Sequence, residues 1–376
     1  MAKLICPYCF ASVERKSLLF RCPGTGPGRA PGCNPPPMFP ADGRKSRAVH
    51  KDCGKTSLIR ACPNCQHELA ADYCDVPSRL VALVGAKESG KSTYICVLIH
   101  ELMNRVGEEF RFSLKACDDR TGRRYQRDFE QYLYNDHQVI PVTQSAGTEP
   151  HDPLVYLLTV QKRRWGRKAL TLVFFDTAGE DLSSSDSVDK HLRYLGASDA
   201  IVFLVDPLAL SGAAADVAPA ARANRTGPLP DDPREVIGRI TNLLRAAENI
   251  PAPKRLRQAV ALAVTKVDAL RAIVAEHSPM HRAREYAGHL DLTDRGLVDE
   301  QVRALLTRWN AGALDRLLGD AYRAHNLFGL SALGHIPSGG DLGRFGISPV
   351  RVEDPLLWLL HRFGMIRASR GSPSKG

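Results

Sequence analysis

The 376-residue sequence has no apolar run long enough to span a lipid bilayer. Its longest apolar stretches, such as Arg79–Gly85 and Ala200–Val205, have the length of single strands, whereas a membrane-spanning helix needs about 20 apolar residues. A cysteine already stands at position 6, which leaves no room for the apolar core of a secretion signal. We therefore expect a cytoplasmic protein without a membrane span. Hydrophobic residues make up 44% of the chain, which excludes a disordered protein.

The large middle of the chain lacks the basic surplus that its net charge of +10 suggests. Residues 1–77 hold 11 Lys and Arg against 6 Asp and Glu, and residues 362–376 hold 4 basic residues and no acidic one. The remaining 36 basic and 35 acidic residues nearly cancel. Seven thiolates around two Zn²⁺ ions would lower the surplus of residues 1–77 from +5 to about +2. The charge therefore does not favour a nucleic-acid partner, which stays an alternative.

Cysteine is scarce beyond the N-terminal region, because eight of the ten cysteines lie in the first 74 residues. Without a secretion signal, paired Cys-x-x-Cys sequences predict structural zinc sites rather than disulfides. The expected ligands of two zinc ions are Cys6, Cys9, Cys22 and Cys33 for one ion, and His50, Cys53, Cys62 and Cys65 for the other. This pairing stays open, because Cys74 can replace His50 or Cys33, and His50 can be a solvated loop residue. Cys96 lies in a predicted helix and is expected in the core.

From position 78 onward, short apolar runs alternate with amphipathic segments. This alternation predicts an α/β fold with a mostly parallel sheet flanked by helices. The predicted strands are 79–85, 110–115, 154–161, 169–175, 200–205, 258–265 and 326–331. The predicted helices are 91–106, 119–136, 233–249, 298–318 and 354–363. Strands 154–161 and 169–175 are expected to form a hairpin, and 139–153 is expected to be a loop.

The strongest motif is GAKESGKS at positions 85–92, which matches G-x-x-x-x-G-K-[ST] and lies between a predicted strand and a predicted helix. Backbone N–H groups and the positive end of a helix can hold phosphate there, with Lys91 reaching the β- and γ-phosphate oxygens and Ser92 coordinating Mg²⁺. The residues of this predicted phosphate-binding loop are Gly85, Ala86, Lys87, Glu88, Ser89, Gly90, Lys91, Ser92 and Thr93.

Three shorter motifs follow, each at the predicted carboxyl end of a strand, where α/β sheets bind their ligands. In DTAG, Asp176 can hold Mg²⁺ through water, and Gly179 offers a backbone N–H to a γ-phosphate. In TKVD, the Asp268 carboxylate can accept hydrogen bonds from two donors of guanine that adenine lacks. The guanine-binding residues expected from TKVD and SAL are Thr265, Lys266, Asp268, Ser331, Ala332 and Leu333.

These motifs, in this order, resemble those of the translation-factor-like P-loop GTPases, the class that includes the small GTPases. Over residues 79–333, GAKESGKS is similar to the first motif of that class, DTAG to the third, TKVD to the fourth and SAL to the fifth. A closer resemblance is to the bacterial zinc-ribbon double-GTPase proteins of conflict systems, carried by CPYC, FRC and CPNC before the loop, by DTAGEDL and FLVDPL, and by the ending EDPLLWLLHRFG.

The predicted organisation is a small Cys-rich zinc-ribbon module over 1–77, followed by a P-loop GTPase domain over 78–366. Insertions are expected at about 207–232 and 277–297, the first of them mobile because it is rich in Ala, Pro, Gly and Asp. Residues 367–376 are expected to form a flexible basic tail. The Pro- and Gly-rich module cannot build an apolar core alone and needs metal to fold.

The sequence departs from the small GTPases at the residues expected to act on the γ-phosphate. Where the small GTPases have small side chains, this chain has Lys87 and Glu88. Glu180 stands where those proteins have a glutamine that orients the attacking water. Lys87 and Glu180 are predicted to pair across the γ-phosphate, so that both join Lys91 and Gly179 as catalytic residues. In the alternative, Lys87 points into solvent and Glu180 pairs elsewhere on the switch loop that follows DTAG. The switch threonine that would bind Mg²⁺ is predicted to be Thr148, with Thr143 nearly as good a candidate.

Together these patterns predict a switch that binds GTP or GDP, hydrolyses GTP slowly without a partner, and is read by proteins through its switch loops and zinc module. Its cofactors would be Mg²⁺ and two structural Zn²⁺ ions. The expected setting is a regulatory role in a bacterial multi-protein system of the conflict or defence type. The alternatives are a zinc-ribbon nucleic-acid-binding protein that nucleotide regulates, and an interaction scaffold that holds nucleotide with little turnover.

Overall fold

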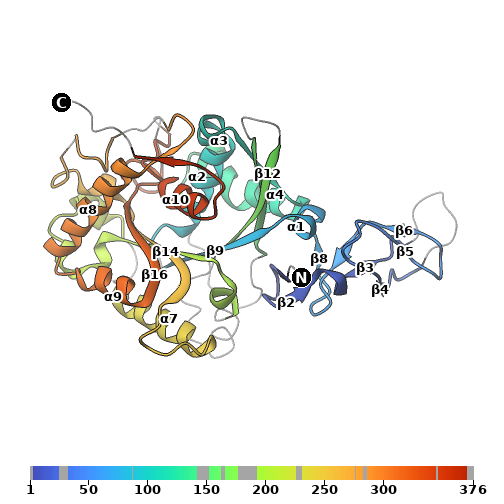
Figure 1. Cartoon of the computed structure of the whole chain (residues 1–376). Helices are drawn as coiled ribbons and strands as arrows, with labels where there is room; N and C mark the ends of the chain where they lie inside the picture. Colours follow the sequence, from blue (N-terminus) through green and yellow to red (C-terminus); the bar gives the residue numbers. More distant parts are fainter. Residues whose placement is uncertain are drawn as a thin grey trace.

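A seven-stranded sheet forms the centre of the protein (Figure 1). A computed structural model describes residues 3–24, 33–86, 88–141, 152–161, 166–176, 193–225, 231–275, 277–282, 286–343 and 346–370. The strands of the central sheet are, in spatial order, β10 (Phe112–Ala116), β11 (Leu154–Gln161), β12 (Arg167–Asp176), β9 (Ser78–Gly85), β13 (Ala200–Val205), β14 (Leu256–Val264) and β16 (Tyr322–Gly329). β11 runs antiparallel to both of its neighbours, and the other neighbouring pairs are parallel. The mostly parallel α/β sheet and the 154–175 hairpin are therefore confirmed.

Helices cover both faces of this sheet. Successive side chains of a strand point to opposite faces, and the strands carry apolar side chains on both, so each face needs a covering layer. In β9, Val81 and Leu83 pack into one apolar cluster, whereas Leu80, Ala82 and Val84 pack into the other. The first cluster includes residues of α2 (Lys91–Met103), α3 (Arg105–Phe110), α4 (Asp119–Tyr125), the π-helix Gln126–Asn135 and α10 (Asp354–Arg362). The second includes residues of α7 (Pro233–Ala247), α8 (Leu292–Arg308) and α9 (Ala313–Ala321). No described helix is both long and apolar enough for a membrane crossing.

Two predicted helices are each divided in the structure. The helix expected over 91–106 ends at Met103, because the Asn104 side chain donates to the His100 carbonyl and its backbone leaves the helical region (φ −111°, ψ −113°). The helix expected over 298–318 begins earlier, at Leu292, where the Asp291 carboxylate accepts from the backbone N–H groups of the first turn. It ends at Arg308, and α9 begins only at Ala313.

The segments expected to be insertions and a tail contain regular structure. Residues 207–223 form two short 3₁₀ turns (Pro207–Ala209 and Ser211–Ala213) and helix α6 (Pro219–Ala223). The second expected insertion ends with β15 (Leu290–Asp291) and the first residues of α8. The expected flexible tail begins with β17 (Ala368–Ser369), which pairs in parallel with β15. These described parts therefore contain regular secondary structure, and the division into insertions and a flexible tail stays a prediction.

The N-terminal module consists of short strands that extend from the sheet-containing body (Figure 1). Its strands are β1 (Lys3–Ile5), β2 (Ser12–Glu14), β3 (Leu19–Arg21), β4 (Met38–Pro40), β5 (Ala48–Val49), β6 (Thr56–Ser57), β7 (Arg60–Ala61) and β8 (Glu68–Leu69). Helix α1 (Ala71–Asp75) leads into β9, and buried Arg60 binds the Asp75 carboxylate through two nitrogens, each 2.7 Å from an oxygen. This pair fixes the base of the module to the helix that enters the sheet.

Candidate functional site

The predicted phosphate-binding loop connects the end of β9 to the start of α2. Glu88 (φ 62°) and Gly90 (φ 86°) both have left-handed backbone conformations, which turn the loop back onto the helix N-terminus. Such a loop presents several N–H groups to one anion beside the positive end of the helix dipole. Gly85 has no room for a side chain, because a Cβ atom would lie 2.7 Å from the Leu204 carbonyl oxygen. The local geometry is that of an anion-binding turn.

Lys91 lies across this loop and is almost completely buried. Its Nζ atom donates to the carbonyl oxygens of Gly85 at 2.7 Å and Ala86 at 3.0 Å. These two hydrogen bonds hold the ammonium group against the loop, where its charge can interact with phosphate oxygens. Ser92 and Thr93 of the first turn of α2 line the same cavity, and the buried Ser89 hydroxyl has no hydrogen-bond partner among the described residues. These polar groups suit a phosphate chain with its cation.

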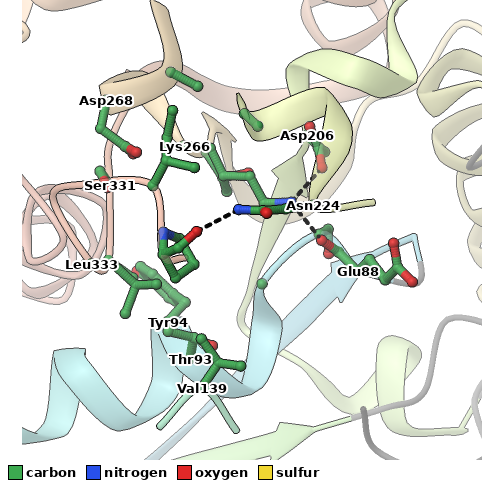
Figure 2. A pocket seen from close by; sticks show the side chains of 18 of the residues that line it. Glu88, Thr93, Tyr94, Val139, Asp206, Asn224, Lys266, Asp268, Ser331 and Leu333 are labelled. Atoms are coloured by element: carbon green, nitrogen blue, oxygen red, sulfur yellow. Dashed lines mark hydrogen bonds and ion pairs between the residues drawn. The ribbon is translucent and has the colours of Figure 1, made fainter. Parts of the chain in front are cut away.

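Lys266 connects the predicted guanine loop to the phosphate-binding loop. Its Nζ atom lies 2.6 Å from a carboxylate oxygen of Asp206 and 3.0 Å from the Glu88 carbonyl oxygen (Figure 2). Asp206 was not among the predicted site residues, although it directly follows the predicted strand 200–205 and sequence reasoning could have found it there. The ion pair holds the lysine stem along the cavity, between the two loops.

Asp268, Ser331 and Leu333 lie on one side of this cavity (Figure 2). Within the described part of the chain, no hydrogen-bond donor contacts the Asp268 carboxylate, so its oxygens can accept from a ligand. The Ser331 N–H already donates to the Val350 carbonyl at 2.9 Å, and its hydroxyl accepts from the Gly334 N–H at 2.8 Å. A backbone donor for a guanine oxygen would thus come from Ala332 or Leu333. Thr265 also lines the cavity.

The predicted magnesium and switch residues fall mostly outside the described residues. Asp176 is the last residue of β12, and its backbone lies beside Leu83, two positions before Gly85. This register brings the backbone at Asp176 close to the phosphate-binding loop. Lys87, Thr143, Thr148, Gly179 and Glu180 lie outside the described residues. Their roles, and the pairing of Lys87 with Glu180, stay predictions.

The phosphate and guanine loops enclose a cavity of about 700 Å³. Its walls also include segments that sequence analysis did not assign to the site: Val139–Pro141, Ala221, Ala223–Arg225 and His335–Pro337 with Gly339–Gly340. No motif in the sequence marks these segments, because they reach the cavity only through tertiary contacts. The cavity can therefore hold a phosphate chain at one end and a base at the other.

The candidate metal ligands of the N-terminal module gather in two groups, but not in the predicted pairing. The proximal cluster contains Cys6, Cys9, Cys62 and Cys65, and the distal cluster contains Cys22, Cys33, His50 and Cys53. Within each group the ligand atoms all lie within 4.8 Å of one another. The pairing of Cys6 and Cys9 with Cys22 and Cys33 is wrong, because β3 pairs with β7 so that Leu19 lies opposite Ala61. This register brings the turn with Cys62 and Cys65 to the end of β3 beside the β1–β2 hairpin.

Within each cluster, several ligand atoms lie 3.3–3.8 Å apart. The sulfur atoms of Cys6 and Cys65 are 3.7 Å apart, and those of Cys9 and Cys62 are 3.8 Å apart. In the distal cluster, His50 Nδ1 lies 3.5 Å from the sulfur of Cys33 and 3.3 Å from that of Cys53. The other ring nitrogen of His50, Nε2, lies 3.4 Å from an oxygen of Asp52. His50 is thus a member of the cluster and not a solvated loop residue.

The surroundings of these thiols shift their pKa values in different directions. Burial raises the pKa of Cys6 well above its usual range, and burial also raises the pKa of Cys65 to about 11. Hydrogen bonds from the Lys55 backbone N–H and the His50 ring lower the pKa of Cys53 to about 6. A divalent ion favours the thiolate form by direct ligation. Cys74 belongs to neither cluster, and Cys96 is a buried core residue of α2, as expected.

The sheet, the turn after β9 and the cavity define a P-loop nucleotide-binding domain. More narrowly, the chain belongs to the Double-GTPase 2 family, whose model matches residues 79–308. The closer resemblance inferred from the sequence is therefore confirmed. A GTPase fold of this kind implies binding of GTP or GDP with Mg²⁺.

The chain is also similar to a putative ESX-1 scaffolding and assembly protein, SaeC, of Mycolicibacterium smegmatis. The two are 29% identical over 409 residues, covering 96% of this chain and 99% of the relative. Among solved structures, similar chains are the Arl6 small GTPase of Trypanosoma brucei (15% identity, TM-score 0.28, 76% of this chain and 98% of that one) and the G domain of the T. maritima FeoB iron transporter (10%, 0.27, 69% and 90%). These structures are too distant to bear on function.

Proposed function

We propose that the protein is a GTP-binding switch that hydrolyses GTP to GDP and phosphate. The observation that carries this proposal is the single cavity that joins Lys91 and Ser92 at one end to Asp268 and Leu333 at the other. Lys91 would neutralise phosphate charge, Ser92 and Asp176 would hold Mg²⁺, and Gly179 would contact the γ-phosphate. Thr148 would complete the magnesium site in the GTP form. Glu180, offset by Lys87, would orient the attacking water.

Guanine selectivity tests the nucleotide assignment. Asp268→Asn replaces the carboxylate that would accept from the two guanine donors, so GTP binding should weaken by about 2–4 kcal/mol. Xanthosine triphosphate, which offers an acceptor in place of one donor, should bind the variant better than the unmodified protein. Isothermal titration with GTP, ATP and xanthosine triphosphate measures all three affinities. The matched control is Asp320→Asn, the same change at an exposed position at the end of α9. Equal affinity of the unmodified protein for ATP and GTP contradicts the assignment.

Turnover is a separate part of the proposal. Release of phosphate under multiple-turnover conditions separates a working GTPase from a scaffold that only holds nucleotide. Intrinsic turnover should be slow, far below one per second, because no arginine finger is identified among the described residues. Glu180→Ala should lower phosphate release at least tenfold while GTP affinity stays within a few-fold, since the residue would act only in the transition state. Unchanged hydrolysis in that variant contradicts the role of Glu180.

The two N-terminal clusters are proposed to hold one Zn²⁺ each. Tetrahedral zinc with sulfur ligands at about 2.3 Å requires sulfur atoms about 3.8 Å apart, and a nitrogen ligand shortens that edge to about 3.6 Å. The distances in the proximal cluster (3.7 and 3.8 Å) and in the distal cluster (3.5 and 3.3 Å to His50 Nδ1) support this geometry. Ligation through Nδ1 would leave the proton on Nε2, facing Asp52. Elemental analysis should give about two zinc ions per chain.

We further propose that the chain consists of a zinc-ribbon module over 1–77 and a GTPase domain over 78–366, working in the cytoplasm. Protein partners would read the nucleotide state through the switch loops and the module. The assembly role in the name of the mycobacterial relative supports a multi-protein setting for this chain. It gives no particular support to a conflict or defence system. Strongly salt-dependent binding of RNA or DNA would instead favour the nucleic-acid alternative.

A further inference from the structure

The segment that follows β13 is fixed to the guanine end of the cavity. The Asp206 carboxylate accepts from the Leu208 N–H at 2.9 Å, which starts the first 3₁₀ turn. Further along, Asp216 accepts from the Trp309 indole at 2.9 Å and from Arg308 at 2.7 Å. The Ala218 N–H then donates at 2.9 Å to the Ala269 carbonyl, one residue after Asp268. Helix α6 therefore starts from a position tied to the predicted guanine-binding loop.

At the end of α6, Asn224 reaches across to the loop that follows the SAL motif. Its side-chain N–H donates to the Pro337 carbonyl oxygen at 2.5 Å (Figure 2). Both residues line the cavity, although they are 113 positions apart in the chain. Asn224 is exposed, so this contact lies on the outer wall of the cavity.

The same loop is held on its other flank by residues 137–139, which precede the segment with the predicted switch threonine. The Val139 N–H donates to the Gly340 carbonyl at 2.9 Å, and the Leu342 N–H donates to the His137 carbonyl at 3.0 Å. Gln138 and Asp341 form a bridge between the two backbones. Residues 334–343 are thus tied to α6 on one side and to residues 137–139 on the other.

We propose that Asn224 is a positioning residue for nucleotide retention: its bond to Pro337 closes the cavity over a bound guanine nucleotide, and nucleotide leaves only when this bond opens. The proposal rests on the proposed GTP-binding function and deepens it. A nucleotide under this contact would have α6 and the 334–343 loop on opposite sides, so its release requires the two to separate. Because the bond is exposed, its loss should change release by a modest factor and leave the fold intact.

The test measures GDP release from the full-length, metal-containing protein. Protein loaded with radiolabelled GDP is chased with excess unlabelled GDP, and retained label is followed by filter binding. Asn224→Ala should release GDP roughly two- to tenfold faster, the range expected for one exposed hydrogen bond. Asn224→Asp, which presents an oxygen to the Pro337 carbonyl in place of the N–H, should be at least as fast. The control is Asn242→Ala, an exposed asparagine on α7, which should leave release unchanged.

Two further measurements separate this role from a structural one. Single-turnover hydrolysis of prebound GTP and the preference for GTP over ATP should be the same in Asn224→Ala as in the unmodified protein. Unchanged GDP release in both Asn224 variants, with normal guanine binding, overturns the proposal while leaving the GTPase assignment intact. Equal acceleration in the Asn242→Ala control also overturns it. If the unmodified protein binds no guanine nucleotide, the proposed function itself fails.

Discussion

The proximal and distal clusters offer nearly the same ligands but are embedded in different surroundings. Cys6 and Cys62 of the proximal cluster are fully buried in the large apolar cluster that also contains Leu80 of β9 and Tyr194. The distal cluster shares Cys22 with a small separate core of Phe20, Cys22 and Phe39. The contrast indicates that the proximal site is part of the GTPase body, whereas the distal site supports only the far end of the module.

Direct contacts explain why the proximal site is joined to the body. The Phe10 ring, which follows the Cys6–Cys9 knuckle, lies with its centroid 5.2 Å from that of Tyr194. The Tyr73 hydroxyl, close to the start of β9, donates to the Ile5 carbonyl at 2.5 Å. Tyr194 in turn donates to the Val81 carbonyl in the middle of β9 at 3.1 Å. A change at the proximal site can therefore alter the packing of the strand that leads into the phosphate-binding loop.

The largest effect is expected from removing the proximal metal. Cys6→Ser combined with Cys9→Ser should lower the metal content from two ions to one and lower the melting temperature of the GTPase domain by about 10 °C or more, because metal ligation is coupled to folding of the buried contact. GTP binding at low temperature should largely survive, since no ligand belongs to the phosphate-binding loop. Elemental analysis and calorimetry provide the measurements. An unchanged melting temperature would show that the proximal cluster stabilises the GTPase domain no more than the distal cluster does.

An effect no larger than this is expected from cutting the contact while keeping both metals. Phe10→Ala should destabilise the GTPase domain by about 3–5 kcal/mol, the usual cost of removing a buried phenyl ring, and should leave two metal ions bound. The matched control is Phe39→Ala, which removes an equally buried ring beside the distal cluster. Chemical denaturation monitored by nucleotide binding should show a less stable GTPase domain in Phe10→Ala and an unchanged one in Phe39→Ala. Equal losses in the two variants would contradict the separation of the two cores.

The smallest effect on the GTPase domain is expected from the distal cluster. Cys22→Ser combined with Cys53→Ser should also lower the metal content to one ion, because the remaining Cys33 and His50 cannot complete a tetrahedral site. Limited proteolysis should then cut the far end of the module, whose core is too small to fold without metal. The affinity for GTP should stay within about twofold and the melting temperature within about 2 °C. If GTP affinity fell as much as in Asp268→Asn, the distal cluster would contribute to nucleotide binding, contrary to this prediction.

The sequence predicted those walls of the cavity that depend on a strand and the turn after it. The loop from Gly85 to Ser92 could be found because one short segment contains the whole anion-binding geometry. Asp268 and Leu333 could be found because parallel strands end at one edge of the sheet. Asn224 and Pro337 could not, since their meeting depends on how α6 packs. The metal pairing also failed, because sequence spacing does not reveal that β3 and β7 are neighbours.

The nested arrangement of the candidate ligands has a consequence for the order in which the chain would acquire the two proposed metal ions during synthesis. The distal site lies inside the proximal one along the chain: its ligands run from Cys22 to Cys53, whereas the proximal ligands run from Cys6 to Cys65. A chain growing from its N-terminus exposes every distal ligand before Cys62 and Cys65 have been made. The inner site can therefore be filled first, and the outer site closes around a finished loop. Both can be complete before β9 emerges, so that the nascent sheet meets a preformed surface.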